Sequence, residues 1–141
     1  MTTNRKRRSA VLANGRNKHG PRYVRIFHWE MDSPAWKEMT PYGRTIVLEL
    51  RKRFNGSNNG EIHLSVREAA KAIDCHRDTA AKALREVEEK GWVRINQKGS
   101  FDWKGGLATT FILTNEPMGD GSATKDFMSW KPVSENKTRS Y

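Results

Sequence analysis

The residues best suited to chemistry lie on one face of a helix predicted over residues 77–90. At about 100° per residue, four apolar side chains line one side of this helix, namely Ala80, Ala83, Leu84 and Val87. The opposite side and its flanks carry basic, polar and small residues, namely Arg77, Asp78, Thr79, Ala81, Lys82 and Arg85. Arg and Lys donate hydrogen bonds to guanine edges, and short polar groups meet other bases or phosphate. We therefore expect this helix to enter a DNA groove by its N-terminal half, with Glu86, Glu88 and Glu89 held away from the phosphates.

The same residues also fit an ordinary solvated helix face. Three pairs of opposite charge stand four residues apart, namely Asp78 with Lys82, Lys82 with Glu86, and Arg85 with Glu89. If these pairs form, the cations are occupied within the helix. The surrounding elements favour the groove-binding interpretation.

Another helix is predicted directly before the helix over residues 77–90. Ser65 and Glu68 have the spacing of a capping box, so this helix begins at Val66. Its inner face carries two small residues, Ala69 and Ala70, which allow the next helix to cross closely. A turn at residues 74–75 interrupts the pattern. Gly91 ends the following helix, over residues 77–90, at a position that needs a left-handed residue.

Other elements complete a small domain. Ser33 before Pro34 and Thr40 before Pro41 predict two helix starts, of which the second begins a helix over residues 41–54. The apolar stripe of that helix consists of Tyr42, Ile46, Val47, Leu50 and Phe54, and its last turn is basic, with Arg51, Lys52 and Arg53 at the negative end of the dipole. Strands are expected over residues 61–64, 92–96 and 107–114, with a Gly-rich turn over residues 97–106.

This order of elements, from about Ser33 to Thr114, resembles the winged helix-turn-helix family of bacterial DNA-binding regulators. The matching features are the Ser65 cap, Ala70 at the close crossing, Thr79 and Leu84 in the second helix, and the EEKGWV run that leads into the wing. The resemblance implies an α+β fold with three main helices, a small antiparallel sheet and a wing, and it implies binding to double-stranded DNA. The sequence departs from the family at Asp74, where Gly is usual in the turn, and at His76, where a Ser-like cap is usual.

The wing is predicted over residues 97–106. Lys98 and Lys104 are placed to meet backbone phosphate, and Phe101 and Trp103 are large apolar groups in an otherwise polar turn. These two rings either stack on unpaired bases, fold back on the base of the wing, or pack against a second protomer.

The positive charge of the chain is concentrated at its N-terminus. The net charge is +10, and residues 1–29 hold eight Lys or Arg and no acid. The run Arg5, Lys6, Arg7 and Arg8 suits a flexible arm that tracks phosphates or enters a minor groove. A solubilising tail or an organelle transit peptide is the alternative for this segment.

We expect one domain over residues 23–130, between an arm at 1–22 and a flexible tail at 131–141. An extended segment over Tyr23–Trp29 is expected to lie on the domain, and Phe127, Met128 and Trp130 are expected to dock as a short helix or anchor. These two aromatic segments are the candidates for a weak homodimer, with a monomer as the alternative.

We expect no enzyme, no metal site and no cofactor. Cys75 is the single cysteine, and no histidine has metal-ligand spacing with a second one. Cys75 is interpreted as a buried, inert thiol in the turn, with a redox switch as the alternative. Without a secretory signal or a membrane-length apolar run, a cytoplasmic location is expected, with no membrane partner and no small-molecule ligand.

These features favour a transcriptional regulator that binds double-stranded DNA. A replication initiator or accessory protein of a plasmid or phage fits the same pattern, because such proteins contain similar winged-helix domains. A protein-interaction module that uses Phe101, Trp103 and Trp130 is the alternative from another class.

Overall fold

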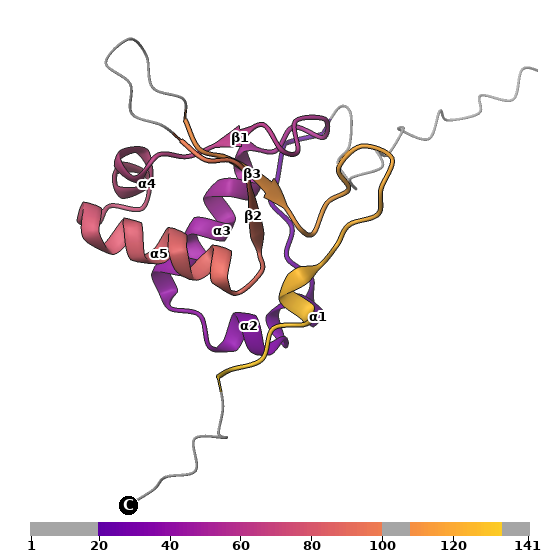
Figure 1. The fold of residues 1–141 in the computed structure, drawn as a ribbon, viewed down its shortest axis with the longest axis horizontal. Coiled ribbons are helices and arrows are strands. Elements are labelled where there is room, and N and C mark those ends of the chain that lie inside the picture. The colour runs from indigo at the N-terminus through magenta and orange to yellow at the C-terminus, as the bar shows by residue number, and fades with distance from the viewer. Residues whose placement is uncertain (1–19, 100–107, 134–141) are drawn as a thin grey trace, which may run out of the picture.

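In a computed structural model of the chain, the residues described are 20–99 and 108–133. These residues form an α+β fold with a small antiparallel sheet, whose strand order is β1-β3-β2 (Figure 1). The elements in chain order are α1 (His28–Met31), α2 (Pro34–Lys37), α3 (Pro41–Arg53), β1 (Ile62–His63), α4 (Val66–Ala72), α5 (Arg77–Glu89), β2 (Val93–Gln97), β3 (Thr110–Leu113) and the 3-10 helix η1 (Asp126–Met128). Among the described residues, no helix is long and apolar enough to cross a membrane.

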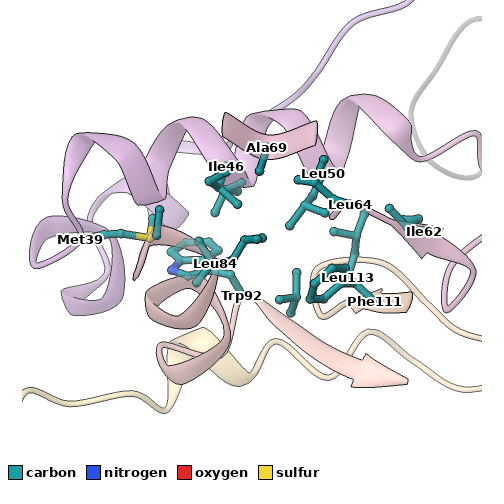
Figure 2. Close-up of a cluster of buried hydrophobic side chains, with 14 of the residues drawn as sticks. Met39, Ile46, Leu50, Ile62, Leu64, Ala69, Leu84, Trp92, Phe111 and Leu113 are labelled. Carbon is teal, nitrogen blue, oxygen red and sulfur yellow. The ribbon is translucent and has the colours of Figure 1, made fainter. Parts of the chain in front are cut away.

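The core lies where α3, α4 and α5 meet the sheet (Figure 2). The predicted inner stripes of α3 and α5 supply much of it, because Ile46, Leu50 and Val87 are fully buried. Ile62 and Leu64, on either side of His63, also point inward, as their alternation predicted. Burying each such side chain stabilises the fold by roughly 1.5–3 kcal/mol. This core fixes the position of α5 relative to the β2–β3 hairpin.

The predicted helix starts are confirmed. The side chains of Ser33, Thr40 and Ser65 each accept a hydrogen bond from a backbone amide three residues later. Each such cap stabilises its helix by about 1 kcal/mol. Glu68 departs from the predicted capping box, because its carboxylate accepts a hydrogen bond from Arg53 Nη1 at 3.2 Å.

The predicted turns are also confirmed. Asp74 adopts a left-handed conformation with φ of 53°, in the place where the resembled family usually has Gly. Gly91 has φ of 81° directly after α5, and a Cβ there would come within 2.8 Å of the backbone at Asp126 and Phe127. A glycine at 91 therefore lets η1 pack against the end of α5.

Several predictions of detail were wrong. Residues 28–31 form a helix, so Trp29 does not belong to an extended segment. Tyr42 is 48% exposed, because it lies at the first turn of α3, beyond the edge of the core. β2 spans Val93–Gln97, one residue later than predicted, and β3 is shorter than predicted, because it spans only Thr110–Leu113.

The largest correction concerns Arg51, which was predicted only to interact with the negative end of the α3 dipole. Its Nη2 pairs with Glu30 Oε1, its Nη1 lies 3.2 Å from Glu30 Oε2, and the two residues are only 4% and 1% exposed. Arg51 also donates to the Arg25 carbonyl at 2.9 Å, and Glu30 accepts from the Phe27 amide at 2.8 Å. This buried pair clamps the N-terminal flank of the domain onto α3.

Aromatic rings join the two flanks of the domain. Phe27 stacks on Trp29 with centroids 5.7 Å apart, Trp29 on Phe127 at 6.0 Å, and Phe127 on Trp92 at 4.1 Å. Phe127 is fully buried in η1, whereas Met128 is exposed and Trp130 is half-buried. The two segments predicted as candidates for a dimer contact therefore pack on each other within one chain.

Candidate nucleic-acid interface

The outer face of α5 is held outward by the way in which α4 and α5 pack. The turn at Asp74 and a hydrogen bond from the Cys75 amide to the Ala70 carbonyl, at 3.0 Å, set the angle between the two helices. The apolar stripe of α5 faces α3 and α4, so the opposite side faces solvent. The structure brings the predicted residues together there: Arg77, Asp78, Lys82 and Arg85 are exposed, and Thr79 and Ala81 are half-buried.

The three ion pairs of the solvated-face alternative do not form among the described residues. Glu86 turns away from Lys82 and lies 3.4 Å from Lys90 Nζ. Asp78 lies beside His76, with Oδ2 3.5 Å from Nδ1. Within the described part of the chain, Arg77, Lys82 and Arg85 have no carboxylate partner, so their donors are available to an external anion.

Glu86 has a role that the sequence did not indicate. Its Oε1 accepts from the Thr40 amide at 2.9 Å and from Thr40 Oγ1 at 2.8 Å. The carboxylate therefore sits at the positive N-terminal end of α3, where negative charge is stabilising. Gly43 makes room for it, since a Cβ at this position would collide with Glu86 Oε1 and come within 2.7 Å of Met39 Cγ.

His76 caps α5, although its type is unusual at this position. Its Nδ1 accepts from the Asp78 amide at 3.2 Å, which requires that Nδ1 carry no proton. The start of α5 is thus ordered on the surface, and this is the end predicted to enter a groove. A weaker cap is expected from His at this position, and the long bond agrees with that expectation.

The β2–β3 hairpin stands beside α5. A bulge between Ile95 and Gln97 marks its far end, where Gln97 donates to Thr110 Oγ1 at 3.1 Å and Lys98 is exposed. An open groove of about 630 Å³ separates α5 from the hairpin, with Val66, Ala81, Leu84, Arg85 and Ile95 among its walls. The predicted wing residues Phe101, Trp103 and Lys104 lie outside the described residues.

The predicted arm residues Arg5, Lys6, Arg7 and Arg8 also lie outside the described residues. The segment that precedes α1 runs on the side of the domain away from α4 and α5 (Figure 1). An arm that reaches DNA bound at α5 therefore has to pass around the domain.

The described residues contain no cluster of three or more His, Cys, Asp or Glu that could hold a metal ion. Cys75 is half-buried against the core, and is not fully buried as predicted. Away from α5, hydrogen bonds from Arg94 hold the pKa of the Asp126 carboxyl below its ordinary value. This pair ties η1 to β2 and does not belong to the outer face of α5.

Sequence reasoning missed the buried pair of Glu30 and Arg51 and the role of Glu86 at the start of α3. Glu30 is the first acid after a long basic stretch, which is a weak signal that it pairs with a base. Glu86 carries no signal of its own, since Thr40 stands 46 residues away. In comparisons with known proteins, no protein-family model, curated protein or solved structure matched this chain.

Proposed function

We propose that this chain is a winged helix-turn-helix protein that binds double-stranded DNA through the outer face of α5. The observation that carries the proposal is the set of three exposed cations, Arg77, Lys82 and Arg85, which form no ion pair with another described residue. Arg and Lys side chains in this arrangement donate to guanine edges and to phosphate. The order of α3, α4, α5 and the hairpin supports the fold part of the proposal.

Each part of the molecule has a role in this proposal. Lys82 and Arg85 meet base edges, Asp78 and Thr79 contact neighbouring base or backbone groups, and Ala81 allows close approach. Lys98, directly after β2, contacts phosphate, as does Lys104 in the predicted wing. The basic arm adds contacts that depend on salt and little on sequence. Transcriptional regulation is the use that we propose, with plasmid or phage replication as the alternative.

Selection of bound sequences from a pool of random duplexes tests the proposal. We expect a recurrent motif after several rounds, and binding to that motif that is stronger than to a scrambled duplex. A chain whose binding shows no sequence preference at any salt concentration contradicts base reading by α5. Lys37→Ala, which changes an exposed lysine on α2, provides a control for loss of charge alone.

A further inference from the structure

A second basic and aromatic surface lies on the N-terminal flank, away from α5. Five exposed side chains occur within eight residues of chain, namely Arg22, Tyr23, Arg25, Phe27 and Trp29. Tyr23, Phe27 and Trp29 are 44%, 41% and 39% exposed. Exposed rings in such numbers on a small domain mark an interaction surface. We call these residues, with Lys52 and Lys125, the flank surface.

Two cations of the flank surface lie against its rings. Phe27 and Trp29 stack with 15° between their planes, and the Arg25 guanidinium carbon lies 4.4 Å from the Phe27 centroid. Lys125 Nζ lies 5.3 Å from the Trp29 centroid. Lys125 holds a left-handed conformation with φ of 49°, which is uncommon for a residue with a side chain. The surface therefore presents positive groups beside exposed ring area.

A hollow lies beside Tyr23 on the flank surface. It is lined by Arg22, Tyr23, Val24 and Lys52 and has a volume of about 320 Å³. Two cations and one aromatic ring thus meet around a space at the small end of the usual range for ligand sites. This combination suits a ligand that has a planar ring to stack on Tyr23 and an anionic group to meet Arg22 and Lys52.

The flank surface is held in place before any partner binds. The buried pair of Arg51 and Glu30 holds this segment, because Arg51 donates to the Arg25 carbonyl and Glu30 accepts from the Phe27 amide. Residues 20–29 contain no acid, and the carboxylate of Glu30 is buried against Arg51. Glu116 is half-buried at the small cavity beneath Tyr23 and Arg25. An anionic partner therefore meets mainly positive charge here, at low cost in ordering.

We propose that the flank surface binds single-stranded nucleic acid, with a base on the Tyr23 ring and phosphates at Arg22, Arg25, Lys52 and Lys125. Single-strand binders combine a positive path with aromatic rings on which unpaired bases stack, and this surface has both parts. A duplex does not use the rings, because its base faces are covered by their neighbours. The proposed site is separate from α5 and does not depend on the duplex-binding proposal.

The test uses the full chain and fluorescence anisotropy with a labelled 20-nucleotide oligothymidylate. An oligomer of the same length without bases measures the contribution of charge alone. We expect Tyr23→Ala to weaken oligothymidylate binding by about fivefold or more, because one stacked base is lost. We expect Tyr23→Phe to bind as the wild type does, and Tyr42→Ala to have no effect, since Tyr42 is similarly exposed on another part of the surface.

Three results would overturn the proposal. One is equal binding of the oligomers with and without bases, and another is an equal effect of Tyr23→Ala and Tyr42→Ala. The third is displacement of oligothymidylate by an acidic peptide at equal charge concentration, which would make this a docking site for an acidic protein. Failure here is distinct from failure of duplex binding, because Lys82→Ala with Arg85→Ala should weaken binding to the duplex and leave oligothymidylate binding unchanged.

Discussion

The last turn of α3 and the outer face of α5 each carry three cations, and the two sets are used differently. Arg51 is buried against Glu30, and Arg53 binds Glu49 at 3.3 Å and Glu68 at 3.2 Å, so only Lys52 is left exposed. Arg77, Lys82 and Arg85 on α5 form no such pairs with described residues. Glu30 and Glu68 reach the α3 cations from other segments and Glu49 from within α3, whereas the acid Glu86 turns from α5 to Thr40. The number of cations on a helix thus says less about function than the positions of the carboxylates around them.

Breaking the α3 pair should have the largest effect. Glu30→Ala leaves Arg51 buried without its carboxylate, and we expect the free energy of unfolding to fall by about 3–5 kcal/mol. Urea denaturation followed by circular dichroism measures this change. Lys52→Ala, next to Arg51 but exposed, should change the stability by less than about 0.5 kcal/mol.

The double variant Glu30→Leu with Arg51→Met sharpens this result. Because it removes both charges and keeps apolar volume, it should recover most of the stability that Glu30→Ala loses. A double variant as unstable as the single one would show that the hydrogen bonds to Arg25 and Phe27 matter more than the charge pair.

On α5, removal of a cation should affect binding and leave stability unchanged. Lys82→Ala and Arg85→Ala should each weaken binding to a selected duplex by about 1–3 kcal/mol if they meet base edges. Titration of both variants against selected and scrambled duplexes measures the loss, and thermal melts monitor the fold. Unchanged affinity in both variants would mean that another face reads the DNA.

Although Glu86 lies on α5, we expect its substitution to lower stability, as substitution of the paired charges of α3 does. Glu86→Ala removes the acceptor of both Thr40 donors, so we expect a loss of about 1–2 kcal/mol in stability. Its effect on the sequence preference of the bound duplex should be small. A variant with normal stability and altered sequence preference would place Glu86 in the reading face and would weaken the contrast between the two helices.

The smallest effect is expected from the exposed pair of Arg94 and Asp126. The pKa of Asp126 is lowered by hydrogen bonds from Arg94, so folding favours the ionised carboxyl. Its contribution to stability is therefore present at neutral pH and is lost as the pH falls below the unfolded-state pKa and through the lower folded-state pKa. Asp126→Asn should reduce the dependence of stability on pH in this acidic range, and urea titrations at several pH values measure it.

Much of the local structure could be predicted from residue type and spacing. The caps at Ser33, Thr40 and Ser65 and the left-handed turns at Asp74 and Gly91 depend on neighbours within a few residues. The stripe on α5 predicted both its buried side and its exposed side. These features follow from backbone geometry and from the period of a helix, which act over one or two turns.

Tertiary structure decided which distant charges and polar groups pair with one another. Arg51 and Glu30 are 21 residues apart, and Glu86 and Thr40 are 46 apart, so no local pattern joins them. The stack of Trp29 on Phe127 likewise joins the two ends of the domain. A charge or a ring finds its partner only after the core has brought distant segments together, because hydrogen bonds and ring contacts act over a few ångströms. For this reason the sequence alone determined the faces of α5, and the folded chain decided that its cations remain available.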